Sequence, residues 1–285
     1  MADQALTSFF DTLDPRQLPL PVHPSVAARA AAILQSGQPT AAELAALAGT
    51  DPVLAGSLFR AANATFYAGL PRVGSLAAAI KRLGSDAARQ VVVTACRDGQ
   101  RTSCGPLTAR YLTPLWQHSL GCAVGSHWLA RHCGYPGLAE TAHLAGLLHD
   151  CGKYLLLAGF AVSAGNGHAG TPIGDQFAAE ILAALHVEFG LRLATAWHLP
   201  EEVARMAGRH HETGVDPQDL LLALVKLANL GCRKVGLGWE SDHYLVLPTT
   251  AEAQFLGIGE IALAEFEIML EDRFQLVPPA TSGAA

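Results

Sequence analysis

The chain has 285 residues, of which 50% are hydrophobic and 15% charged, a composition typical of a protein that buries a large core. Its net charge is −6 and no cluster of lysine and arginine is present, so we expect no direct nucleic-acid binding. The first residues lack a basic, apolar leader, and no stretch of about 18 apolar residues runs without charge or proline. Six cysteines without CxxC spacing predict reduced thiols. We therefore expect a cytoplasmic protein with no membrane partner.

The hydrophobic pattern predicts helix after helix and almost no alternating strand pattern, so the expected fold class is all-α. Thr40 to Glu43 forms a capping box, and Asp51-Pro52 pairs a good N-cap with a proline suited to the first helical position. The predicted helices cover residues 25–35, 41–48, 52–62, 76–83, 86–96, 107–132, 138–149, 175–184, 187–197, 200–211, 217–233 and 259–272.

Two loops divide this helical pattern. Residues 99–106 separate a block of short helices from a long helix, and the glycine-rich segment 165–174 is expected to be a flexible loop. We accordingly expect an N-terminal helical subdomain over 15–98, a helical core over 107–233 and a C-terminal helical extension over 234–285. The apolar helix of the extension either packs on the core or forms a homodimer.

The pentapeptide His149-Asp150-Cys151-Gly152-Lys153 follows an apolar helix and is the strongest candidate for chemistry. A neutral imidazole nitrogen and a carboxylate oxygen together suit borderline divalent metals. His118, His186, His210 and His211 stand in other predicted helices, from which they could converge on the same ion. Each histidine taken singly is equally well explained as a satisfied core or surface residue.

The order of these residues resembles the HD phosphohydrolase superfamily, and the HDxGK turn is similar to that of its cyclic-dinucleotide phosphodiesterase branch. The N-terminal half, together with two segments near residues 186 and 197, resembles the HDOD (HD-related output domain) family more narrowly. The segments that carry this second resemblance are residues 18–21, 51–52, 62–67, 75–80, 83–84, 186–190 and 197–200. The resemblance spans residues 15–232 and implies an HD-like helical core joined to an N-terminal subdomain of the HDOD type.

The resemblance also implies two neighbouring metal positions. The residues that would provide their ligands are His118, His149, Asp150 and Asn229 for the first position and Asp150, His186, His210 and His211 for the second. Asp150 would thus bridge the two ions. Lys153 would hold a phosphate oxygen, and Lys153 and Asp150 would be catalytic residues only if the protein is an active hydrolase.

Three departures from the superfamily pattern argue against an active hydrolase. Asn229 stands where active members have an aspartate, Pro114 replaces a glutamate, and no Gly-Tyr-Pro sequence follows the double histidine. Two divalent ions would carry +4 against a single protein charge of −1, which leaves about +3 in a low-dielectric core. We therefore expect at most one well-held ion, which could be iron, manganese or zinc, at the second position.

Two functions follow from these observations. The favoured one is a bacterial signal-transduction regulatory module of the HDOD type, without robust catalysis, that acts on a signalling protein partner. The alternative is a metal-dependent phosphohydrolase or phosphodiesterase that acts on a nucleotide or cyclic dinucleotide, so a nucleotide ligand stays open. In either case we expect the N-terminal block and the HD-like core to form one cooperative unit.

Overall fold

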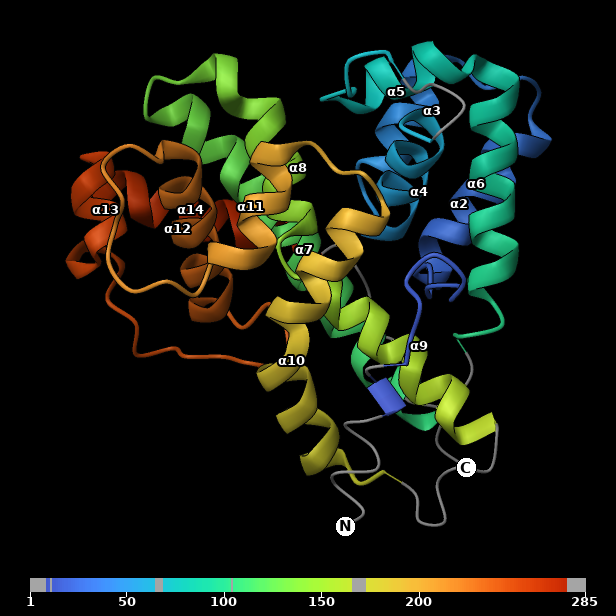
Figure 1. Ribbon diagram of the computed structural model, residues 1–285. Helices are drawn as coiled ribbons and strands as arrows, with labels where there is room; N and C mark the ends of the chain where they lie inside the picture. The colour runs from blue at the N-terminus through green and yellow to red at the C-terminus, as the bar shows by residue number, and fades with distance from the viewer. Residues whose placement is uncertain (1–8, 11, 65–68, 104, 166–172, 276–285) are drawn as a thin grey trace. The chain divides into compact units, whose positions relative to one another are not determined.

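The computed structural model describes residues 9–10, 12–64, 69–103, 105–165 and 173–275, and all of its regular elements are helices (Figure 1). No β-strand occurs in these ranges, which confirms the expected all-α class. Parts of three sequence features lie outside the described residues: the segment 62–67, the glycine-rich loop 165–174 and the end of the C-terminal extension.

The chain divides into two compact units. The first unit comprises Met1–Leu112 and Leu148–Gly208, and the second comprises Thr113–Leu147 and Arg209–Ala285. Each unit is therefore built from two separate stretches of sequence. These limits differ from the boundaries expected from the sequence, and the three-part domain assignment stays a prediction.

The helices of the first unit are α2 (Pro24–Gln35), α3 (Ala41–Ala48), α4 (Pro52–Ala62), α5 (Leu76–Leu83), α6 (Ser85–Gly99), α9 (Cys151–Gly165), α10 (Asp175–Ala196) and most of α11 (Glu201–Arg209). The predicted helix starts are correct where capping signals are strong. Thr40 and Glu43 make both hydrogen bonds of a capping box, and the Asp51 carboxylate accepts hydrogen bonds from the backbone of Val53 and Leu54.

Within the first unit the N-terminal helices pack against α9 and α10. A β-carbon at Gly56 would overlap the Trp197 indole, so glycine is what lets this ring lie against α4. The Asn63 side chain, at the end of α4, donates a hydrogen bond to the His198 carbonyl at 3.0 Å. It also accepts one from the Val73 backbone at 3.0 Å. Asn63 thus acts as a bridge between distant segments, beyond the C-cap role that its sequence position indicates.

The helix prediction for this unit was wrong in two places. The expected helices 175–184 and 187–197 are one continuous helix, α10. Helix α9 was not predicted at all, because the run from Cys151 to Phe160 is buried throughout and shows no polar face by which a helical period could be recognised.

The second unit contains the later part of α7 (Pro106–His132), the short helix η2 (Pro136–Leu138), α8 (Ala139–Leu148), α12 (Leu220–Lys234), η3 (Leu247–Thr249), α13 (Ala251–Leu256) and α14 (Glu260–Gln275). Helix α14 buries one face through Leu263, Phe266 and Leu270. The Phe266 ring fits against Gly125 and Gly231, where a β-carbon would meet it. The C-terminal extension therefore packs within the second unit, and the homodimer stays a prediction.

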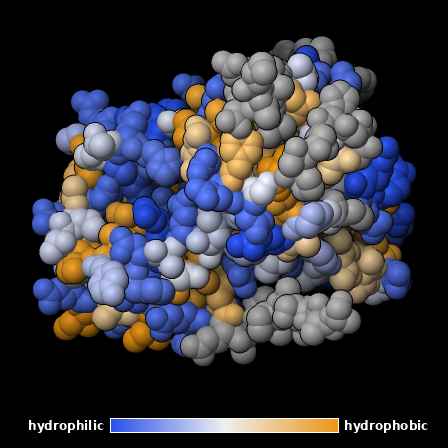
Figure 2. All heavy atoms as spheres, turned by 90° about the horizontal axis from the view of Figure 1, so that it is seen from below, coloured by the Kyte–Doolittle hydropathy of each residue, from blue (hydrophilic) through white to orange (hydrophobic). Residues whose placement is uncertain are grey.

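The outer side of this extension leaves large apolar residues exposed, including Tyr244 (94%) and Ile261 (81%). Apolar residues at the surface are interspersed with polar ones on the face that Figure 2 shows. None of the described helices combines the length and the apolar character that crossing a membrane would require.

Candidate metal centre

The carboxylate of Asp150 lies between two imidazoles in the first unit. Its Oδ2 is 3.4 Å from Nε2 of His149, and its Oδ1 is 3.6 Å from Nε2 of His186. All three side chains are at most 4% exposed. Asp150 therefore presents a different oxygen to each histidine, as a bridging carboxylate would.

Local structure fixes these groups. His149 and Asp150 form the turn between α8 and α9, while His186 lies in the middle of α10. A β-carbon on Gly152 would collide with the His186 carbonyl oxygen and with the Gly190 nitrogen, so only glycine lets α9 approach α10 this closely.

The imidazole of His186 is held in one orientation by the backbone of its own helix. Its Nδ1 donates to the carbonyl oxygens of Leu182 and Ala183 at 2.8 and 2.9 Å. This hydrogen bonding fixes the tautomer and leaves Nε2 directed to Asp150, which is the usual arrangement of a histidine that ligates a metal.

The side chain of Lys153 lies beside the same carboxylate. Its Nζ is 2.7 Å from Oδ2 of Asp150, and the two side chains are 7% and 2% exposed. The ammonium therefore neutralises the only carboxylate among the candidate ligands, on the oxygen that faces His149 and not on the one that faces His186.

The remaining candidate ligands belong to the second unit. His118 on α7 donates from Nδ1 to the Leu237 carbonyl at 3.0 Å, and its Nε2 is 3.6 Å from Sγ of Cys122. His210 is buried and His211 exposed, with ring centroids 4.2 Å apart. Asn229 on α12 is 9% exposed.

Cys122 is a potential soft ligand that the sequence analysis missed. It follows His118 by four residues on the same helix, so both side chains lie on one face. This spacing could have drawn attention to it, because histidine and cysteine are both common zinc ligands.

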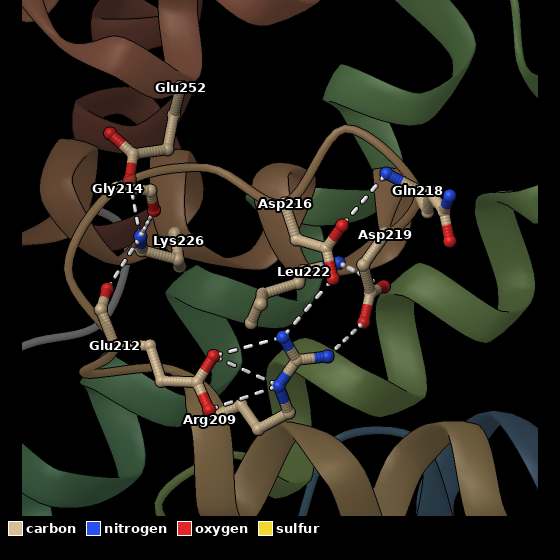
Figure 3. Close-up of polar contacts among 9 residues, drawn as sticks. All are labelled: Arg209, Glu212, Gly214, Asp216, Gln218, Asp219, Leu222, Lys226 and Glu252. Carbon is tan, nitrogen blue, oxygen red and sulfur yellow. Dashed lines mark hydrogen bonds and ion pairs between the residues drawn. The ribbon is translucent and has the colours of Figure 1, made fainter.

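The segment after the double histidine is held by Arg209 (Figure 3). Its guanidinium makes ion pairs of 2.9 Å with Glu212, 3.3 Å with Asp216 and 3.0 Å with Asp219. Hydrogen bonds to Glu212 and then Asp216 raise the pKa of Arg209 further above its ordinary value. Asp219 also caps α12 by accepting from the Leu222 backbone.

A second cation, Lys226 of α12, contacts the same segment from the other side (Figure 3). Its Nζ donates to the carbonyl oxygens of Glu212 and Gly214 and lies 2.7 Å from the carboxylate of Glu252 on α13. Both side chains of the ion pair are 9% exposed. A buried ion pair thus ties the C-terminal extension to the segment that follows His210 and His211.

The donor chemistry of the first unit fits a divalent ion. Two ligand atoms bound at about 2.1 Å to one ion lie roughly 3.0–3.4 Å apart. The separations of 3.4 and 3.6 Å around Asp150 are close to that range. Buried imidazole and carboxylate groups could therefore hold a metal here, and completion of the site by second-unit residues stays a prediction.

An all-helical fold with a buried His-Asp centre agrees with the comparison with protein families. The HDOD domain family matches residues 20–213, which is more than half of the chain. The chain therefore belongs to the HDOD domain family, and the resemblance noted in the sequence is confirmed.

Solved structures with a similar fold include two of the response regulator MmoQ from Methylococcus capsulatus. One is 24% identical, has a TM-score of 0.69 and covers 88% of this chain and 99% of that chain. The other, a fragment, is 25% identical and has a TM-score of 0.62, and the match covers 86% of this chain and 94% of that chain. These similarities establish the fold. Among curated proteins, none matches the chain.

Proposed function

We propose that the chain is a bacterial signal-transduction regulatory module of the HDOD type, with a metal pocket that holds at most one ion and with no robust catalysis. The observation that carries this proposal is the ion pair between Lys153 and Asp150. A pocket with two divalent ions needs a negatively charged ligand between them. Here a protein ammonium already neutralises that ligand.

The position of Lys153 also indicates which half of the pocket is lost. The ammonium lies on Oδ2, the oxygen that faces His149, while Oδ1 faces His186. We infer that Lys153 takes the place of the first ion and that a remaining ion would bind to Oδ1 and His186, with His210 and His211 as the further predicted ligands. An ion bound there would supply Lewis-acid character and a rigid link between its ligands.

A role in signalling is supported by the relatives. The family is the HDOD domain, and the similar protein of Methylococcus capsulatus is named a response regulator. We propose that this chain acts on a protein partner, and that the metal pocket stabilises or reports the conformation that the partner recognises. Cytoplasmic location in a bacterium belongs to the same proposal.

The alternative is a metal-dependent phosphohydrolase that acts on a nucleotide or cyclic dinucleotide. It is favoured by the retained His149-Asp150 turn with its following lysine. In that case Lys153 would leave Asp150 and hold a phosphate oxygen when two ions are bound, and Asp150 would bridge the ions.

Elemental analysis and calorimetric titration with manganese and zinc separate the two functions. Both measurements should be made on the parent chain and on Asp150→Asn, and the hydrolysis of bis(p-nitrophenyl) phosphate by the two proteins should be compared. The regulatory proposal predicts that the parent holds one ion per chain or fewer and that Asp150→Asn loses this ion. It also predicts that the parent hydrolyses the substrate no faster than Asp150→Asn does. Two tightly held ions with turnover that Asp150→Asn abolishes would establish the hydrolase instead.

A further inference from the structure

The first unit contains a cavity of about 510 Å³ that is separate from the His-Asp centre. Its walls come from residues 16–20, from one face each of α4 and α6, and from Trp197 at the end of α10. Small-molecule sites typically enclose about 300–1,000 Å³. The cavity is therefore of a size that admits a small organic ligand.

Most of the lining is apolar. Leu18, Leu20, Val53, Val91 and the Trp197 indole contribute to it. The side chains that can hydrogen-bond are a minority of the lining, and Ser57, Gln90 and Thr94 are among the uncharged ones. A predominantly apolar wall with a few polar groups is the usual composition of a ligand site, because the apolar wall gives affinity and the polar groups fix orientation.

Arg60, in the last turn of α4, supplies the main charged group. Burial lowers the pKa of its guanidinium, an effect that nearby Asp98 partly offsets. Among the described residues its guanidinium makes one hydrogen bond, a long one of 3.5 Å to the Arg16 carbonyl. A guanidinium has five N–H donors, so most of those of Arg60 are available to a ligand.

The charge of the lining sets the charge of the ligand. Among the charged lining residues, Arg16 is paired with Asp14 at 3.1 Å and Asp98 with Arg97 at 3.0 Å. The positive charge that is left belongs to Arg60. A carboxylate carries −1 at neutral pH, whereas a phosphate monoester carries about −1.5 to −2. The planar guanidinium also matches a carboxylate in a bidentate pair.

We propose that this cavity binds a small organic carboxylate with an apolar body, held by Arg60. Because Trp197 caps α10 and His186 lies three turns earlier on that helix, a ligand here contacts the helix that carries a metal-ligand candidate. The proposal identifies the input of the proposed regulatory module. The carboxylate proposal rests on the proposed regulatory function only for the role of the ligand in signalling, since the binding of a carboxylate in this cavity does not require a metal.

Calorimetry with benzoate tests the proposal on the full chain, and tryptophan fluorescence provides a second readout through Trp197. Parent protein should bind benzoate saturably and bind the neutral isostere benzamide at least tenfold more weakly, because a charged hydrogen bond is lost. Arg60→Met keeps the aliphatic stem and should weaken benzoate binding at least tenfold. Arg72→Met removes an exposed arginine that does not line the cavity and is the matched control.

Three results would overturn the proposal: no saturable benzoate binding, equal binding of benzoate and benzamide, or unchanged benzoate binding in Arg60→Met. The comparison of the two ligands on the parent chain remains decisive if the variant does not fold. Metal content measured on the same samples keeps the two proposals apart, since benzoate binding without metal supports the cavity alone.

Discussion

Lys153 and Asp150 form a buried ion pair in which Nζ lies 2.7 Å from Oδ2. The lysine thus supplies, from within α9, a positive charge to the one carboxylate that could bridge two metal ions. A divalent ion that binds through Oδ2 must compete with this ammonium, and a divalent ion at Oδ1 meets its repulsion.

Replacing this lysine should therefore strengthen metal binding. We expect Lys153→Met to raise affinity for manganese or zinc at least tenfold, because a positive charge is removed from the site. Without metal the variant should be less stable by roughly 3–5 kcal/mol, since a buried carboxylate loses its partner. Calorimetric titration and thermal unfolding with and without metal measure both effects. Lys81→Met, at an exposed position, is the control, and equal metal affinity of both variants would contradict the prediction.

Asn229→Asp should also raise affinity for a divalent metal. The substitution adds a negative charge and a stronger oxygen ligand at the position where the superfamily pattern has an aspartate. Counting two bound ions and their ligands but not the Lys153 ammonium, the residual charge would fall from about +3 to about +2. Slow hydrolysis of a generic phosphodiester then becomes an expected gain. Titration beside the parent and Asp150→Asn is the measurement. Equal affinities in all three proteins would mean that the histidines bind no metal.

The ion pair between Lys226 and Glu252 should stabilise the segment that follows the double histidine. Glu252→Gln leaves the Lys226 ammonium buried with only carbonyl oxygens, so we expect a loss of roughly 3 kcal/mol in the free energy of unfolding. The double variant Lys226→Met, Glu252→Gln should recover part of that loss, because the buried charge is gone. Chemical denaturation of the parent, both single variants and the double variant gives the coupling energy, and strictly additive effects would count against the ion pair.

Gly152→Ala should prevent close packing of α9 on α10. The added β-carbon would overlap backbone atoms of His186 and Gly190, which cannot move without shifting the whole helix. We expect a loss of stability beyond roughly 4 kcal/mol, or no folded protein. Gly174→Ala is the matched control, since its β-carbon would meet no atom of the described residues within 4 Å. Similar unfolding midpoints for the two variants would mean that α9 and α10 do not pack this closely at Gly152.

The pH dependence of stability should change when Asp51 is replaced. Burial raises the pKa of Asp51 to about 6, so its contribution to stability is full at low pH and is lost as pH rises to 6. Burial lowers the pKa of His23 to about 4, so its contribution is present above the ordinary value of 6.5 and is lost as pH falls to 4. The two trends oppose each other in the parent chain.

In Asp51→Asn, of these two opposing contributions only that of His23 remains. The free energy of unfolding should then rise with pH between 4 and 6.5 more steeply than in the parent. Urea denaturation at a series of pH values checks this slope. An unchanged slope would mean that Asp51 ionises in the folded chain much as it does in the unfolded chain.

Local sequence determined the secondary structure and pointed to the site. Thr40, Asp51 and Ser75 accept hydrogen bonds from backbone N–H groups of the helices they precede, and a cap of this kind acts only on its own helix. The spaced motifs between residues 18 and 200 indicated the HDOD family, which the family comparison confirms. Periodicity failed at α9 because a helix buried on every side has no polar face.

Tertiary structure alone decided which distant polar groups are paired and which ion pairs are buried. Lys153 lies only three residues after Asp150, so their pairing is local, but the burial of both side chains is not. Nothing local to Lys226 shows that Glu252 reaches it from 26 positions further along the chain. The same holds for Asn63, which bonds to the carbonyl of a residue 135 positions away. Such contacts depend on how helices pack against one another. Burial, which strengthens the interaction between charges, arises only when the core forms. The net charge of the metal pocket therefore could not be predicted from the identity of its ligands.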